Sequence, residues 1–237
     1  MTESTDEQVR QWEEEGYLVL ENAVQGEQLA RLQLTFDYWA AACKDDWLDS
    51  VARGERIATF YDIPDPLVKD DIFINLVDHP SWYELLLRAT CGALVFIAPQ
   101  VRTVPPWPLS YTGWHPDVSP TAPLHIKVQI YVEDVAPGTG EFAFVPGSHK
   151  PASGPYASPH RNESMPGHKS FPGSAGTAIM FNSYGWHTAM DNAGHVRKSI
   201  ILIYEQRDPG NMRGENFSSI ADKCDTPERR ALFRLEV

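Results

Sequence analysis

The side chains best suited to chemistry in this 237-residue chain are two histidines and one aspartate. In His115-Pro116-Asp117, residues i and i+2 of an extended backbone project to one side, so an imidazole and a carboxylate can reach one metal ion. His187 supplies a second imidazole just after an apolar segment. Two histidines and a carboxylate are the facial triad of non-haem iron(II) oxygenases. A catalytic zinc ion would accept the same ligands, so the triad alone leaves a metallohydrolase open.

Arg197 and Ser199 favour the oxygenase over the hydrolase. They follow His187 on one predicted strand, and both point to the same face. An arginine inside a β core needs an anionic partner, because an unpaired buried charge is very costly. A guanidinium binds a carboxylate through two hydrogen bonds, and a serine hydroxyl can add another. The far carboxylate of 2-oxoglutarate fits this role, whereas the alternative is a surface arginine paired with an acidic side chain. We therefore expect iron(II), 2-oxoglutarate and dioxygen as cofactors.

Three further residues are candidates for the cofactor or substrate pocket. Polar and apolar side chains alternate along Leu124–Val135, so one of the two sets faces inward. If the polar set does so, Lys127 and Gln129 contact the cofactor or the substrate; the alternative is a solvated face. Gln100, on the preceding strand, is expected to meet the near end of 2-oxoglutarate.

Helical patterns dominate the N-terminal part, about residues 1–92. Thr5 and Gln8 have the spacing of a capping box and begin a short helix that Gly16 can end. A second helix has apolar residues spaced by three and four, and a third spans about Ser81–Cys91. The apolar face of the second helix consists of Leu29, Leu32, Phe36 and Trp39.

After Gly92 the apolar pattern changes to period two, which is typical of strands. Helices first and strands afterwards indicate one mainly β core, about 93–206, flanked by an α layer and followed by a C-terminal tail, 207–237. At this length we expect a single domain over 1–237. The predicted strands are Tyr17–Leu20, Ala93–Thr103, Leu124–Val135, Glu141–Pro146, Thr177–Asn182 and Val196–Gln206.

Two segments rich in proline and glycine, Val104–Gly113 and Gly147–Gly173, are predicted to be irregular. The second is long for a connection within a domain, and such loops often act as lids. The two segments combine the aromatic residues Trp107, Tyr111 and Tyr156 with hydrogen-bonding groups. This mixture suits a neutral, polar, ring-containing substrate.

The bulk composition excludes several classes of protein. A formal net charge of -12 argues against a basic surface for nucleic acid or an anionic membrane. The three cysteines are far apart and indicate reduced thiols. The N-terminus lacks the features of a signal peptide, and no apolar run approaches the ~20 residues that span a bilayer. We expect a cytoplasmic protein, a monomer or small homo-oligomer, that acts on a small molecule.

Several stretches, in order and with similar spacing, resemble the phytanoyl-CoA dioxygenase (PhyH) family of 2-oxoglutarate oxygenases. The resemblance implies a double-stranded β-helix (a cupin-like jelly roll) with N-terminal helices packed on one sheet. It also implies iron(II) bound by His115, Asp117 and His187, and 2-oxoglutarate anchored by Arg197 and Ser199. The matching stretches are Glu14–Asn22, Trp114–Asp117, Tyr131–Val135, Gly140–Lys150, His187 and Arg197–Ser199.

The chain departs from many relatives at Ala189, where several members carry a serine that helps to hold 2-oxoglutarate; Thr188 is the candidate substitute. By resemblance, the reaction is oxidation of an unactivated C–H bond, by hydroxylation or oxidative cyclisation. We expect tailoring of a secondary metabolite, for example a sugar-containing one, because no basic cluster is present to bind the phosphates of an acyl-CoA. The alternatives are an acyl-CoA hydroxylase and a non-catalytic cupin-like binding protein.

Overall fold

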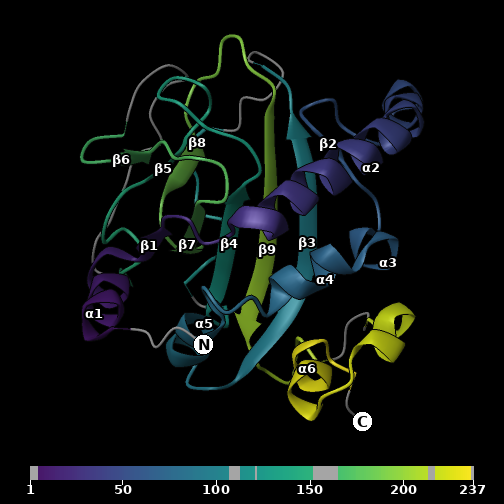
Figure 1. The fold of residues 1–237 in the computed structure, drawn as a ribbon. Coiled ribbons are helices and arrows are strands. Elements are labelled where there is room, and N and C mark those ends of the chain that lie inside the picture. The colour runs from purple at the N-terminus through teal and green to yellow at the C-terminus, as the bar shows by residue number, and fades with distance from the viewer. Residues whose placement is uncertain (1–4, 107–112, 121, 152–164, 213–216, 236–237) are drawn as a thin grey trace.

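The computed structural model describes residues 5–106, 113–120, 122–151, 165–212 and 217–235. Its strands form two antiparallel sheets (Figure 1). The larger sheet has the order β1 (Tyr17–Leu20), β7 (Ala178–Asn182), β4 (His125–Tyr131), β9 (Arg197–Gln206), β3 (Leu94–Val104) and β2 (Tyr61–Asp62). The smaller sheet has the order β6 (Lys169–Phe171), β5 (Phe142–Phe144) and β8 (His187–Ala189).

Helices cover one face of the larger sheet, and in Figure 1 α2 and α4 cross its long strands β3 and β9. Two short helical segments near the C-terminus pack against the same core through Ile220 and Phe233, both fully buried. The helices are α1 (Asp6–Glu15), α2 (Gly26–Ala52), α3 (Pro66–Lys69), α4 (Asp71–Val77), α5 (Tyr83–Ala89), a 3-10 helix (Ser218–Lys223) and α6 (Pro227–Leu232).

The alternation of side chains along β4 and β9 divides the molecule into a packed side and a site side. The apolar set of each strand lies in the main hydrophobic core against the helices. Because successive residues of a strand point to opposite faces, the other set looks toward the smaller sheet. It is the polar set of β4 that faces this way, so Lys127 and Gln129 lie on the inner face rather than on a solvated one. The apolar set on the helix side consists of Ile126, Val128, Ile130, Ile200, Leu202 and Tyr204.

Most of the predicted elements are present, with ends shifted by a few residues. The capping box between Thr5 and Gln8 is formed, and α1 ends at Gly16 in the left-handed conformation. In the apolar face of α2, Leu32 and Phe36 are fully buried. Leu29 and Trp39 are half-buried at the edge of the same core.

The prediction that all of Gly147–Gly173 is irregular is wrong at its end, because Lys169–Phe171 forms β6 against β5. A three-residue strand with one apolar side chain offers too little alternation to recognise. The strands β2 and β8 and the helices α3, α4 and α6 were also not predicted, and each is short. Trp107, Tyr111 and Tyr156, on which the expected substrate class depended, lie outside the described residues.

Candidate active site

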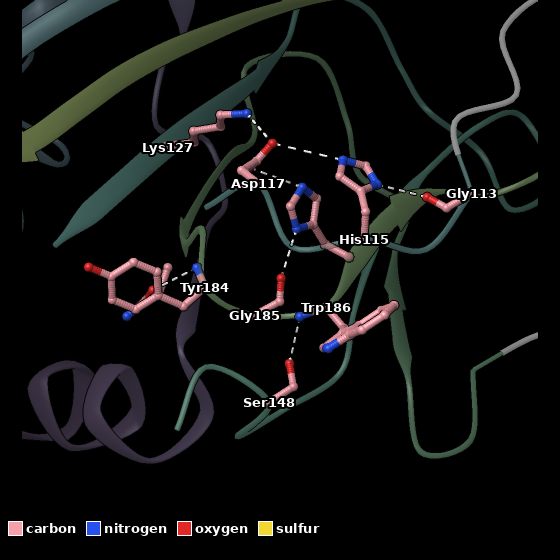
Figure 2. Close-up of polar contacts among 10 residues, drawn as sticks. Gly113, His115, Asp117, Lys127, Ser148, Tyr184, Gly185 and Trp186 are labelled. Carbon is pink, nitrogen blue, oxygen red and sulfur yellow. Dashed lines mark hydrogen bonds and ion pairs between the residues drawn. The ribbon is translucent and has the colours of Figure 1, made fainter. Parts of the chain in front are cut away.

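His115, Asp117 and His187 converge at one point on the inner face of the sheets. Figure 2 shows His115 and Asp117 there, beside Lys127. One ligand atom from each residue lies within 4.8 Å of the others. His187 Nε2 is 3.3 Å from Asp117 Oδ2, and His115 Nε2 is 3.8 Å from Asp117 Oδ1. In the described part of the chain this is the one group of three or more histidine, cysteine or acidic side chains close enough to hold a metal ion. The structure therefore brings together the three residues that the sequence singled out.

Backbone hydrogen bonds hold the two histidines beside each other. His115 and His187 form an isolated antiparallel bridge, in which each backbone N–H donates to the carbonyl of the other, at 3.1 and 3.0 Å. The Asp117 N–H donates to Ser183 O at 2.9 Å. Because Asp117 lies two residues after His115, its side chain returns to the same side as the imidazole. The site thus rests on main-chain pairing, which orients its members before any ligand binds.

Both imidazoles are held in the tautomer that a metal requires. Nδ1 of His115 lies 2.9 Å from Gly113 O, and Nδ1 of His187 lies 2.9 Å from Gly185 O. A nitrogen that faces a carbonyl oxygen carries a proton, so Nε2 of each ring is the atom left to bind a metal, on the side of Asp117. Burial, together with the neighbouring His187, lowers the pKa of His115, which favours the neutral, metal-binding form.

Asp117 is held as a carboxylate. Burial opposes its ionisation, but contacts with His187 and Lys127 outweigh that effect and bring the pKa of Asp117 well below its usual range. Lys127 Nζ donates to Oδ1 at 2.7 Å. Oδ2 is buried and accepts no hydrogen bond from the described residues. One carboxylate oxygen is thus engaged by lysine, and the other is available beside His187 Nε2.

A cavity of about 360 Å³ opens at these three residues. Its floor is the inner face of β3, β9 and β4, and strand register orders the polar side chains across it. Gln100 on β3 and Gln129 on β4 both pair with Ile201 of β9, from opposite sides. Ser199 of β9 lies one step further along, between Arg102 and Tyr131. The cavity lining includes Gln100, Arg102, Val104, His115, Asp117, Lys127, Gln129, His187, Thr188, Ala189, Arg197 and Ile201.

Several buried donors at this cavity have no partner among the described residues. Arg197 is 8% exposed; its Nη1 donates to Gly140 O, whereas its Nε has no acceptor. The Ser199 hydroxyl and Gln129 Nε2 are likewise buried and unpaired. Burial lowers the pKa of Arg197, and this effect outweighs the favourable charges of Tyr131 and Glu141. Buried donors of this kind fit a ligand with several acceptor oxygens, as a dicarboxylate has.

Two of the candidate residues, Thr188 and Lys127, make contacts within the protein that the sequence did not indicate. The Thr188 hydroxyl donates to Ala189 O at 3.1 Å, so it is engaged with neighbouring backbone rather than directed to a ligand. Lys127 contacts the carboxylate of Asp117 and lines the cavity at the same time.

Ser148 has a positioning role that sequence reasoning missed. Its buried hydroxyl accepts a hydrogen bond of 2.8 Å from the backbone N–H of Trp186, next to His187 (Figure 2). Val145 N–H donates to Trp186 O at 2.9 Å. Both backbone polar groups of Trp186 are therefore hydrogen-bonded to the segment that contains Val145 and Ser148. Ser148 lies in the stretch Gly140–Lys150, which resembles the family, and this contact gives it a structural role.

A half-buried His–Asp–His centre, on antiparallel sheets and beside a partly unpaired arginine, defines a candidate non-haem metal site. The profile of the phytanoyl-CoA dioxygenase (PhyH) family matches residues 12–199, which contain all three candidate ligands and Arg197. The chain belongs to this family. Members of the family use iron(II), 2-oxoglutarate and dioxygen, and the donor set described above fits the metal.

Solved structures with a similar fold include two from nogalamycin biosynthesis. The non-haem α-ketoglutarate-dependent epimerase SnoN shares 19% identity, with a TM-score of 0.59 over 83% of this chain and 81% of its own. The carbocyclase SnoK shares 19% identity, with a TM-score of 0.61 over 86% and 85%. AviO1 from Streptomyces viridochromogenes Tue57 shares 19%, with a TM-score of 0.60 over 88% and 97%. At this identity the likeness concerns the fold. A search of curated proteins finds no match.

Among the described residues, no helix has the length and apolar character needed to cross a membrane.

Proposed function

We propose that this chain is an iron(II)- and 2-oxoglutarate-dependent dioxygenase, with its two sheets arranged as a double-stranded β-helix. The observation that carries the proposal is the position of Arg197. Its buried, partly unpaired guanidinium lines the same cavity as the two imidazole Nε2 atoms and the Asp117 carboxylate. A zinc hydrolase would use the triad but would leave Arg197 without an ion-pair partner among the described residues, and a buried charge without such a partner is costly.

The metal ligands, the Arg197–Ser199 pair and the two glutamines of the floor each have a task in this proposal. His115, Asp117 and His187 hold iron(II), which, with bound 2-oxoglutarate, supplies the oxidation of a C–H bond by dioxygen while 2-oxoglutarate becomes succinate and carbon dioxide. Arg197 and Ser199 bind the far carboxylate of 2-oxoglutarate by charge-assisted and neutral hydrogen bonds. Gln100 and Gln129, on the floor on either side of Ile201, donate to its remaining oxygens or to the substrate.

The proposed substrate is a small natural product with oxygen-bearing rings, for example a glycosylated one. The cavity combines its polar floor with the rings of Phe60, Phe142 and Phe181, a mixture that suits rings carrying polar groups. SnoN, similar in fold, has been crystallised with Fe3+, α-ketoglutarate and nogalamycin RO. An acyl-CoA fits less well, because its phosphates need free cations. Of the lysine and arginine side chains that line the cavity in the described part of the chain, Lys127 and Arg102 already pair with Asp117 and Asp62.

Substrate-dependent formation of succinate tests this proposal. The purified protein is given iron(II), 2-oxoglutarate and dioxygen with a panel of glycosylated natural products, and in parallel with phytanoyl-CoA and shorter acyl-CoAs. The expected result is succinate formation stimulated by a member of the first group and abolished in the His187→Ala protein. Efficient turnover of an acyl-CoA would refute the substrate class, and an equally active His187→Ala protein would refute the triad.

A further inference from the structure

Arg102 is a charged side chain that lines the cavity, and the proposed function gives it no task. It lies on β3, and its side chain is 16% exposed. Nε and Nη2 each lie 2.8 Å from a carboxylate oxygen of Asp62, which is on the adjacent edge strand β2. Its Cζ lies 3.4 Å from the centre of the Phe60 ring, so the guanidinium packs against the ring. Both Phe60 and Arg102 line the cavity.

These two contacts fix the guanidinium but leave part of it available. A guanidinium carries five N–H donors in one plane. In Arg102, Nε and Nη2 each donate one hydrogen bond to the carboxylate of Asp62. Packing on Phe60 prevents rotation of that plane. Among the described residues, Asp62 is the only hydrogen-bonding partner of Arg102. The N–H groups of Nη1 of Arg102 therefore point in a fixed direction. The side chain loses little additional conformational entropy when they bind an acceptor.

The charge of Arg102 is already balanced. Asp62 neutralises it, as Asp117 balances Lys127, and Arg197 is the cation left for a carboxylate of 2-oxoglutarate. A second carboxylate placed at Arg102 would also face the carboxylate of Asp62, and like charges in a poorly hydrated site repel. A neutral acceptor oxygen meets the same donors without that repulsion.

We propose that Arg102, fixed by Asp62 and Phe60, binds a neutral acceptor oxygen of the substrate. The acceptor is a hydroxyl, ether or carbonyl oxygen, and the contact makes the site selective for uncharged, oxygen-rich molecules over anionic ones. This inference rests on the proposed function and specifies the substrate class of the same cavity. Arg102 is a specificity-determining residue here, and neither the metal nor 2-oxoglutarate depends on it.

Two probes that differ by one carboxylate test the inference. They are p-nitrophenyl β-D-glucopyranoside, which is neutral, and p-nitrophenyl β-D-glucuronide, which is anionic. Each is titrated by calorimetry into protein loaded with manganese(II) and 2-oxoglutarate, a complex that binds without turning over. The 2-oxoglutarate titration comes first: if the wild-type protein binds no 2-oxoglutarate, the proposed function itself fails, separately from the role of Arg102.

The wild-type protein is expected to bind the glucoside at least about tenfold more tightly than the glucuronide. Arg102→Met keeps the length and removes the donors, so it should weaken glucoside binding by roughly 10- to 100-fold. Its affinity for 2-oxoglutarate should stay unchanged. Asp62→Asn leaves the arginine charge unbalanced and should reverse the preference toward the glucuronide.

Two further variants separate recognition from stability. Arg102→Met combined with Asp62→Leu replaces both ion-pair partners by apolar groups, so thermal stability should be retained while glucoside binding is still lost. Arg229→Met removes an ion pair of similar burial, with Asp78, away from the cavity. It should lower thermal stability and leave glucoside binding as in the wild type.

Several results would overturn the inference. The first is that Arg102→Met binds the glucoside as tightly as the wild-type protein does. The second is that the wild-type protein binds both probes equally well. The third is that protein which binds 2-oxoglutarate binds neither probe. Weaker 2-oxoglutarate binding in Arg102→Met would assign the residue to the cosubstrate instead.

Discussion

Lys127 Nζ lies 2.7 Å from Asp117 Oδ1, so the lysine contacts a candidate metal ligand directly. The sequence pointed only to a contact of Lys127 with cofactor or substrate. The observed pairing gives it a second task, because it holds one carboxylate oxygen and leaves Oδ2 beside His187 Nε2. Groups that hydrogen-bond to metal ligands often contribute strongly to metal affinity.

Lys127→Met should weaken binding of manganese(II) by roughly 10- to 100-fold, because the Asp117 carboxylate loses the donor that orients it. Titration of manganese(II) followed by electron paramagnetic resonance measures the free ion. If the variant bound manganese(II) more tightly than the wild type, charge repulsion by the lysine would outweigh its orienting effect, and this account of Lys127 would be wrong.

Arg197→Met should have opposite effects on ligand binding and on stability. The charge-assisted pair with 2-oxoglutarate is lost, which should weaken 2-oxoglutarate binding by about 10- to 150-fold. The protein without ligands loses a buried guanidinium that forms no ion pair with the described residues, and replacing such a charge by an apolar group is often neutral or stabilising. Its thermal midpoint should therefore not fall. Calorimetric titration and thermal unfolding of the same samples test both statements; unchanged 2-oxoglutarate affinity would place the anchor elsewhere.

Ser148→Ala should lower both stability and metal affinity. The Trp186 N–H would lose its acceptor, at a cost of about 1–3 kcal/mol in the free energy of unfolding. Because Trp186 precedes His187, the ligand would also be less well held. Ser81→Ala is the matched control: this half-buried hydroxyl donates to Ala23 O at 2.8 Å, outside the site. Equal metal affinity of the two variants would show that Ser148 supports only the fold.

Gly16→Ala should destabilise the protein more than Gly138→Ala. Both glycines have left-handed backbone, with φ of 83° and 78°, so each substitution carries the roughly 1–2 kcal/mol cost of that conformation. At Gly138 a Cβ would meet open space, whereas at Gly16 it would collide with the imidazole of His149. Chemical denaturation measures the difference. Equal losses of stability would mean that His149 moves aside freely.

The parts of the site that follow from spacing along one strand could be predicted from the sequence. His115 and Asp117 share a side because they are two residues apart. The same rule placed Arg197 with Ser199 on one face of their strand, and Lys127 with Gln129 on one face of theirs. Period two alone does not say which face of β4 is inside. That choice depends on the helices, which cover the face carrying Ile126, Val128 and Ile130.

Contacts between distant segments were not predictable from one sequence. Arg102 pairs with Asp62 because β2 joins the edge of β3, but Tyr61–Asp62 is too short to show an alternating pattern. Ser148 meets Trp186 because β5 pairs with β8, another strand of three residues. Register between strands decides both contacts, and a single sequence carries little information on register when the strands are this short.

The central claim is that His115, Asp117 and His187 bind iron(II) beside a 2-oxoglutarate anchored by Arg197. The most direct measurement is anaerobic: iron(II) is added to the protein, 2-oxoglutarate is titrated in, and the visible charge-transfer absorption of the iron(II)–2-oxoglutarate chelate is recorded. The account predicts that the band forms and saturates in the wild-type protein, is absent in His187→Ala, and requires far more 2-oxoglutarate in Arg197→Met. No band in folded wild-type protein, or a full band in folded His187→Ala, would contradict it.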